Sequence, residues 1–429
     1  MKKLLSLGMA AAMAVSLAAC GGSAASTSTA ASEPTADTAS DAAQSEAAPA
    51  ADVDTYGIDK TLNVGVLVSD ATSSEALAFR SYYLDYIAKQ YDVNFVYSDE
   101  LSDAAGETTA LENFINQGMQ AVISLSSFDR PAQLEICEEA GIYYAIAAGT
   151  LTEDEYSTYK DYEHYVGSVG PSLDTEYQTG YDMAKHYIDE GKTSYLIFGG
   201  AAAFGTDMHI YRVAGMLAAM CDADASTNYG GATDKDGILA ALAGTSMDTG
   251  KFASDTYSVD YMDGYNMDDA WWGTIAEKTS APGLQVVLSV GNGSDFFGTM
   301  IAGKDIQVAS VDSFTEDYGK AMEAGQLDWM AGKFNASVAP VFIATMDAVN
   351  GAAIRTADGG ALMLDQGYWE ADGVDTYNTY LAKVSDAENP AYTKAILDKY
   401  VVTADNTVTY DDFAAFVSAY SFDEISAMA

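Results

Sequence analysis

The chain has 429 residues, of which 20 are basic and 63 acidic, so its formal net charge is −43. A field of that sign repels nucleic acid and anionic ligands, which disfavours any partner that presents a phosphate backbone. Because 49% of the residues are hydrophobic, a chain of this length can bury more than one domain core. The acidity is typical of a solvated surface on an exported protein.

The N-terminus has the pattern of a secretory signal. Lys2 and Lys3 precede an apolar run over residues 4–19 that ends in small residues, and this run is too short to predict a membrane span. Leu17-Ala18-Ala19-Cys20 resembles a bacterial lipobox, in which cleavage before the cysteine is coupled to its acylation. We therefore expect residues 1–19 to be a lipoprotein signal peptide and Cys20 to anchor the chain in a membrane. An ordinary signal peptide with an incidental cysteine is the alternative.

A segment of low complexity follows the cysteine. Residues 20–59 are rich in Ala, Ser, Thr, Pro and acidic side chains, with no aromatic residue before Tyr56. Such a segment cannot bury enough apolar surface to offset the entropy lost on ordering. We expect a disordered tether that holds a folded body away from the membrane.

From Leu62 onward, short apolar runs alternate with helical patterns. The runs predict strands at 62–68, 94–97, 121–125, 143–148, 165–169, 194–198, 257–261, 284–290, 306–311 and 327–333. Strands that are apolar throughout and alternate with helices indicate parallel sheets covered on both faces. The predicted fold class is therefore α/β, with two Rossmann-like lobes joined by hinge crossovers and a ligand cleft between them.

The alternation also predicts the order of the lobes along the chain. We expect an N-terminal lobe over 60–167, a C-terminal lobe over 168–332 and a return to the N-terminal lobe over 333–365. Residues 366–429 form a C-terminal extension that the sequence assigns to neither lobe.

The loops after the strands contain the candidate ligand-binding residues, because ligands of open parallel sheets bind beyond the carboxyl ends of the strands. Polar groups and aromatic edges in these loops suit a neutral hydroxylated solute. Capping of the next helix is the alternative role for the acidic and hydroxyl residues, and a surface salt bridge is the alternative for the arginine. The candidates are Asp70, Ser73, Glu75, Phe128, Asp129, Phe204, Arg212, Asn292, Asp312 and Lys333.

The lobe pattern, the lipidated tether and the segment "VVLSVGNGSDFFG…IQVASVDSFTEDYGKAMEAGQ" together resemble the type I periplasmic binding proteins of ABC importers, the ribose-binding-like sugar receptors. The resemblance covers roughly residues 62–351. It implies that Asn292 and Asp312 contact the ligand and that Lys333 lies on a hinge strand. It also implies a ligand-facing role for Arg212 or its neighbour His209.

By this resemblance, the chain is a lipid-anchored extracytoplasmic receptor at the cell surface or in the periplasm. It would capture a small neutral polar solute, most simply a sugar, and deliver it as a monomer to an ABC permease. A nucleoside-binding lipoprotein of the same fold and a surface sensor or adhesion module remain open, as does a secreted hydrolase with a dispersed site.

The sequence offers no pattern for a metal, a cofactor or a catalytic site. Its three histidines do not have the spacing of metal ligands. The sequence also has no nucleophile elbow, no phosphate-binding loop and no pattern for an activated nucleophile. We therefore expect a binding protein and not an enzyme. Cys137 and Cys221 lie in apolar helical contexts, which predicts two buried free thiols and no disulfide framework.

Overall fold

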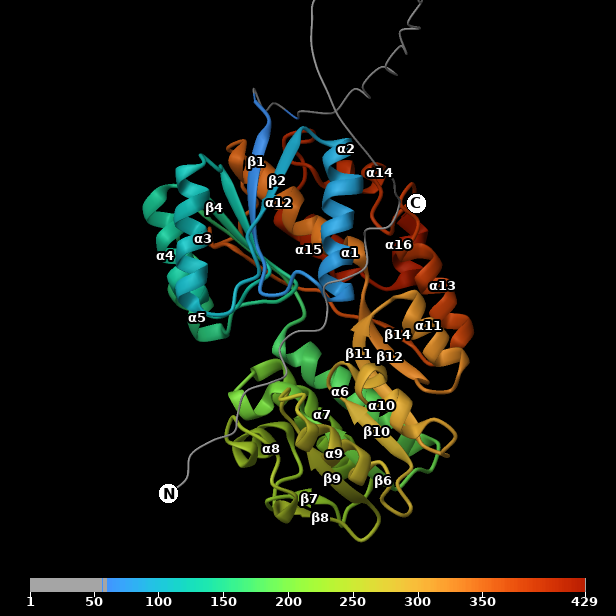
Figure 1. Ribbon diagram of the computed structural model, residues 1–429. Helices are drawn as coiled ribbons and strands as arrows, with labels where there is room; N and C mark the ends of the chain where they lie inside the picture. Colours follow the sequence, from blue (N-terminus) through green and yellow to red (C-terminus); the bar gives the residue numbers. More distant parts are fainter. Residues whose placement is uncertain (1–55, 57–59, 429) are drawn as a thin grey trace, which may run out of the picture. The chain divides into compact units, whose positions relative to one another are not determined.

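The computed structural model describes residue 56 and residues 60–428. Two six-stranded sheets organise this part of the chain (Figure 1). The predicted signal peptide, Cys20 and all of the predicted tether except Tyr56 lie outside the described residues. Within them, no helix is both long enough and apolar enough to cross a membrane.

The first sheet is parallel throughout, in the order β13-β5-β4-β3-β1-β2. Its strands are β1 (Leu62–Leu67), β2 (Val93–Tyr97), β3 (Ala121–Ser124), β4 (Tyr143–Ala147), β5 (Tyr165–Gly170) and β13 (Leu362–Asp365).

The second sheet has the order β14-β12-β11-β10-β6-β9, and only its edge strand β14 is antiparallel. Its strands are β6 (Ser194–Phe198), β9 (Ser258–Met262), β10 (Val286–Ser289), β11 (Gln307–Ser313), β12 (Trp329–Lys333) and β14 (Trp369–Ala371). The first five strands of each sheet along the chain thus have the same relative order in both sheets, which is the doubly wound arrangement. The predicted α/β fold class is confirmed.

Helices cover both faces of the sheets, as Figure 1 shows. Around the first sheet they are α1 (Ser74–Ser81), the π-helical turn η1 (Tyr82–Ile87), α2 (Ala88–Gln90), α3 (Ala104–Asn116), α4 (Arg130–Ala140), α5 (Glu153–Tyr159) and α12 (Ala339–Val349). Around the second they are α6 (Leu173–Asp189), α7 (Asp207–Ala223), α8 (Lys235–Leu242), α9 (Asp269–Lys278), α10 (Gly293–Ile301) and α11 (Glu316–Glu323).

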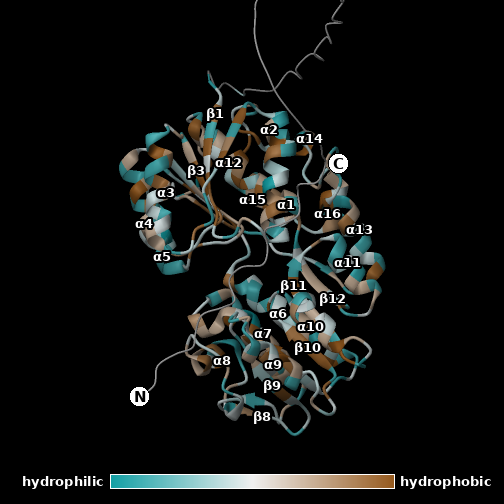
Figure 2. Ribbon diagram, in the orientation of Figure 1, coloured by the Kyte–Doolittle hydropathy of each residue, from teal (hydrophilic) through white to brown (hydrophobic). Residues whose placement is uncertain are grey.

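Alternate residues of a strand belong to different cores. On β6, Tyr195 and Ile197 pack with α6 and α7, whereas Leu196 and Phe198 pack with α9 and α10. The side chains of a strand alternate between faces, so a strand covered on both sides is apolar at most of its positions. Figure 2 shows this as brown strands, with teal residues on the outer turns of helices such as α3 and α4.

The chain passes between the sheets three times. It crosses from β5 to α6, from β12 through the short helix η4 (Asn335–Val338) to α12, and from β13 to β14. Beyond β14, α13 (Val374–Val384) packs on α11, whereas α14 (Lys394–Leu397) packs on α12 and α15 (Tyr410–Ser418) on β13. The chain ends with α16 (Phe422–Met428).

The two cysteines of the described residues are free and buried, as predicted. Cys137 lies on α4 and Cys221 on α7. Burial raises the pKa of the Cys137 thiol to about 12 and that of Cys221 to about 11. Both thiols are therefore protonated and inert at neutral pH.

Candidate functional site

Side chains from both sheets line one cavity of about 460 Å³, which we call the main cavity. The loop after β1 and the first turn of α1 form one wall. The loops after β10 and β11, the end of β12, and α7 form the other. The cavity therefore lies at the carboxyl ends of the strands, where open parallel sheets bind ligands.

The wall from the first sheet begins with a tight turn at Asp70. Its Oδ1 accepts hydrogen bonds from the backbone N–H groups of Thr72 (2.8 Å) and Ser73 (2.9 Å). Burial acts to raise the pKa of Asp70, but the hydrogen bonds from Ser73 and Thr72 outweigh it and lower the pKa below its usual value. Ser73 then caps α1, with its Oγ accepting from the N–H of Ala76 at 3.2 Å. Local hydrogen bonds thus fix this wall, and Asp70 is held as a carboxylate.

An ion pair joins the two walls. Lys333 Nζ, at the end of β12, lies 3.4 Å from Oε1 of Glu75 in the first turn of α1. The same ammonium lies 5.8 Å from the ring centroid of Tyr368, within the range of a cation–π contact. Lys333 is thus placed between an aromatic face and a carboxylate, at the border of the cavity.

Arg212 lines the main cavity but is held mostly by other protein groups. Its Nε donates to Glu176 Oε2 at 2.7 Å, and its Nη2 donates to the Tyr368 hydroxyl at 2.8 Å. Nη1 donates to the carbonyl of Val290, and the Tyr368 hydroxyl donates in turn to Glu176 Oε1. Arg212 is 4% exposed, so its first role is to position the cavity wall.

His209, the neighbour of Arg212 on α7, also lines the main cavity. Its Nδ1 accepts from the N–H of Ala201 at 2.8 Å, which assigns the ring proton to Nε2. Burial, with a contribution from Arg212, lowers the pKa of His209 to about 3. The imidazole is therefore neutral and can offer Nε2–H as a donor to a ligand.

Asp312 and Asn292 meet where β10 and β11 end. Asn292 has a left-handed backbone (φ 56°) and its N–H donates to Asp312 Oδ2 at 2.9 Å. Ser310 Oγ donates to the same oxygen at 2.9 Å. Burial, reinforced by the nearby Asp295, raises the pKa of Asp312 to about 7 against these hydrogen bonds. Near neutral pH this group can accept or donate a hydrogen bond.

The structure brings seven of the ten predicted residues to the main cavity and leaves three outside it. The seven are Asp70, Ser73, Glu75, Arg212, Asn292, Asp312 and Lys333. Phe128 and Phe204 are 51% and 72% exposed and do not line it. Asp129 instead caps α4, with its Oδ1 accepting from the N–H of Ala132. Capping, the alternative role, accounts for this last residue.

Several cavity residues were missed by sequence reasoning. Tyr265 follows the weakly apolar strand β9, and Tyr318 lies within α11 and donates to Asp295 Oδ2 at 2.7 Å. Tyr368 comes from the crossing between β13 and β14, strands whose short runs gave no sequence signal. The loop after β9 could have been included by the rule that selected the other loops; the others depend on tertiary packing.

Solved structures of solute-binding proteins match this chain over most of its length. The arabinose-binding component of an ABC transporter from Shewanella sp. ANA-3 is 17% identical, with a TM-score of 0.53 over 75% of this chain and 95% of that chain. A solute-binding protein from Bacillus halodurans C-125 with bound myo-inositol is 18% identical, with a TM-score of 0.53 over 76% and 99%. A periplasmic sugar-binding protein from Pseudomonas fluorescens is 13% identical, with a TM-score of 0.58 over 85% and 99%.

This chain has the fold of a type I periplasmic binding protein. No protein-family model and no curated protein matches its sequence. The similar structures are described as binding proteins, two of them as components of ABC transporters. At 13–18% identity the likeness establishes the fold, and function must be argued from the cavity.

The main cavity of this periplasmic-binding-protein fold is acidic. Carboxyl groups of Asp70, Glu75, Asp295 and Asp312 line it, together with the cations Arg212 and Lys333. Since Arg212 is matched by the buried Glu176 behind it, the wall disfavours an anionic ligand. Among the described residues, no group of three His, Cys, Asp or Glu side chains could hold a metal ion.

Proposed function

We propose that the chain is a lipid-anchored extracytoplasmic receptor that captures a small neutral polyhydroxylated solute, most simply a sugar, for an ABC importer. The observation that carries this proposal is the main cavity, in which carboxylates, hydroxyls and tyrosines from both sheets face one space. Sugars need acceptors and donors at their edges and apolar surface against their rings. The bound arabinofuranose, myo-inositol and D-allose in proteins of the same fold support the same ligand class.

Capture works by stabilising a closed form. A solute that contacts Asp70 and Glu75 on one side and Asn292 and Asp312 on the other makes all its contacts only when both walls approach it. Differential affinity of this kind shifts the population toward the closed form. In this proposal the permease recognises that form.

The anchor is the second part of the proposal. Acylation of Cys20 would keep the receptor beside its membrane partner, with residues 20–59 as the tether. A Cys20→Ser variant should move from the membrane fraction to the aqueous fraction of cells that express the full chain. Retention of the variant in the membrane would contradict the lipid anchor but not the solute site.

A thermal-shift screen of neutral sugars, nucleosides and amino acids tests the ligand class, followed by calorimetry on any compound that raises the Tm. We expect neutral sugars to give the shift. An Asp312→Ala variant should weaken binding by about tenfold or more, because one charge-assisted hydrogen bond is lost. Asp305→Ala, an exposed residue just before the same strand β11, is the matched control.

The outcomes separate the alternatives. A shift with nucleosides alone would favour a nucleoside receptor of the same fold. Full affinity in Asp312→Ala would contradict the site, and turnover of a bound compound would contradict the receptor itself.

A further inference from the structure

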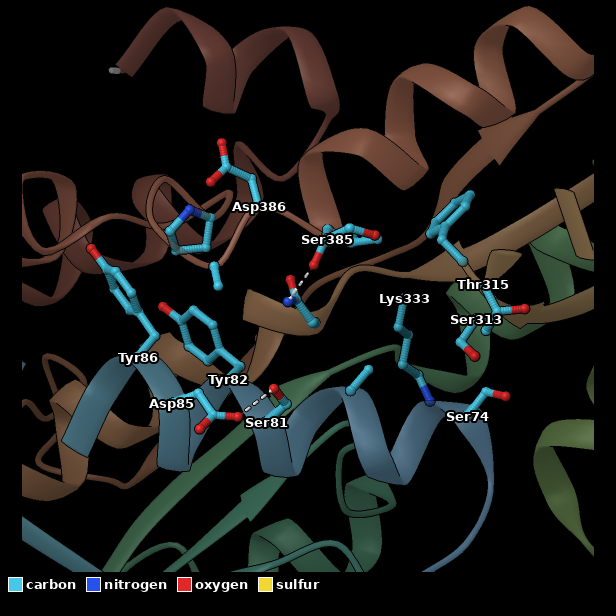
Figure 3. A pocket seen from close by; sticks show the side chains of 16 residues that line it. Ser74, Ser81, Tyr82, Asp85, Tyr86, Ser313, Thr315, Lys333, Ser385 and Asp386 are labelled. Atoms are coloured by element: carbon cyan, nitrogen blue, oxygen red, sulfur yellow. Dashed lines mark hydrogen bonds between the residues drawn. The ribbon is translucent and has the colours of Figure 1, made fainter. Parts of the chain in front are cut away.

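A second cavity of about 350 Å³ lies beside the main cavity, and no part of the proposed function uses it. One wall is a face of α1 and η1, with Ala78, Ser81, Tyr82, Asp85 and Tyr86. The ends of β11 and β12 form another wall. The third comes from the C-terminal segment 384–390, which faces α1 across the space in Figure 3. The C-terminal extension thus supplies one wall of this cavity.

The two cavities adjoin. Ser74, Ser313 and Lys333 line both of them. The group at their border is the ion pair between Lys333 and Glu75, whose nitrogen and oxygen lie 3.4 Å apart. That separation exceeds the 2.7–2.9 Å of a strong charge-assisted hydrogen bond. Because both members of this pair are long, flexible side chains, a ligand can displace them without moving their backbone.

The second cavity is more apolar than the main one, but it also combines hydroxyls, carboxylates and aromatic rings. Hydroxyls of Ser81, Thr315 and Ser385 and carboxylates of Asp85 and Asp386 surround it, with the rings of Phe314, Tyr82 and Tyr86 (Figure 3). The lining carboxylates disfavour anionic ligands here as well.

One lining residue has an unmet hydrogen-bonding group. Asn335 donates from Nδ2 to the carbonyl of Val384 at 2.7 Å, which fixes the orientation of its amide. Its Oδ1 is shielded from solvent and has no hydrogen-bond partner among the described residues. Buried polar atoms are nearly always paired, so this oxygen is an unsatisfied acceptor in the cavity wall, which a ligand hydroxyl can pair only when the wall moves to admit it.

We infer that the receptor takes an elongated neutral ligand, an oligosaccharide or sugar conjugate, with one end in the main cavity and the other in the second. The inference rests on the proposed function. The Lys333–Glu75 pair opens as the ligand passes, and its two charged groups then bind hydroxyls of the ligand at the junction. The C-terminal extension supplies the outer wall of the second subsite.

Calorimetry on the purified protein tests this, with gluco-, manno-, galacto- and xylo-oligosaccharides and their parent monosaccharides as probes. In at least one series we expect the disaccharide or a longer member to bind about tenfold or more tightly than its monosaccharide. Ala78→Trp fills the second cavity without touching the main one. It should bring the affinity for the longer ligand down to that for the monosaccharide, whose own affinity stays unchanged.

Ala105→Trp, at an exposed position of α3, is the matched control and should alter neither affinity. If Ala78→Trp does not fold, Ser81→Ala is the second variant. It removes a lining hydroxyl, which donates to Asp85 at 2.8 Å, and should weaken the longer ligand selectively. Monosaccharides that bind as tightly as every longer homologue would overturn the second subsite and leave the proposed function standing. Binding of no sugar in the wider screen would overturn both.

Discussion

Asp312 is the candidate ligand-binding residue whose pKa is raised by burial in the folded protein. The end of β11 places it beside Asn292 and Ser310, whose groups donate to its carboxylate. Burial nevertheless raises its pKa to about 7, from the ordinary 3.8. Between these values the folded protein holds a proton that the unfolded chain has released. The contribution of Asp312 to stability therefore falls as the pH rises from about 4 to about 7.

An Asp312→Asn variant lacks this titration. We expect the Tm of the variant, relative to that of the wild type, to be higher at pH 8 than at pH 5, because only the wild type must bury the charge at pH 8. Thermal melts of the ligand-free proteins measure this difference, and Asp305→Asn controls for the change in net charge. The same difference at both pH values would contradict the raised pKa.

Arg212 and Glu176 form a buried ion pair whose exposed fractions are each 5% or less. Glu176→Ala leaves the guanidinium charge buried and uncompensated, so we expect the free energy of unfolding to fall by about 3–5 kcal/mol. Asp189→Ala on the same helix α6 breaks an exposed pair with Lys185 and should cost about 1 kcal/mol or less. Urea denaturation measures both, and equal losses would contradict the structural role of Glu176.

At the scale of elements, α6 and α7 pack so closely that glycine is required at their contact. A Cβ at Gly215 would lie 2.0 Å from the carbonyl oxygen of Tyr177, and a Cβ at Gly180 would lie 2.0 Å from that of Arg212. Helices that carry side chains at their contact are usually 8–10 Å apart. The two glycines therefore set how near α7, which carries His209 and Arg212, approaches the rest of the site.

Gly215→Ala should lower the free energy of unfolding by about 1–3 kcal/mol or more, because the helices must separate. Gly273→Ala, in α9, has no atom within 4 Å of the new Cβ. The higher helix propensity of alanine should raise the free energy of unfolding by up to about 1 kcal/mol. Chemical denaturation of both variants is the measurement. A neutral Gly215→Ala would show that the contact can relax.

At the scale of the whole molecule, the C-terminal segment belongs to the folded body. The Trp369 ring stacks on Phe334 at 4.5 Å, and its Nε1 donates to the carbonyl of Tyr420. The hydroxyl of Tyr82, on η1, donates to the carbonyl of Tyr392. These contacts join the extension to the crossing after β12, where Phe334 lies, and to η1, which lines the second cavity.

Asp347 is the buried attachment point of this segment. Its carboxylate accepts from the N–H groups of Val402 (2.8 Å) and Thr403 (3.0 Å) and from the Thr403 hydroxyl. Asp347→Ala leaves these donors unpaired, at about 1–3 kcal/mol for each buried group. We expect faster hydrogen exchange in 398–418 and a lower Tm. Asp405→Ala, which removes the cap of an exposed turn, is the control. It should leave the Tm unchanged and should alter hydrogen exchange only within its own loop.

The sequence by itself determined the fold class and much of the main cavity. Apolar runs that alternate with helices specify parallel sheets, since such strands must be buried on both faces. The carboxyl-edge rule then selected Asp70, Asn292 and Asp312 from the loops. Local rules sufficed here because each residue lies at the end of a strand or within three residues beyond it.

Only the tertiary structure decided which residues from distant segments line the two cavities. Tyr368 reaches Arg212 from a crossing 156 residues away, and segment 384–390 meets α1 to form the second cavity. Neither contact has a periodic signal, because each depends on where the chain returns after β12 and β13. The sequence thus located one edge of a binding site, and packing determined its size and its outer wall.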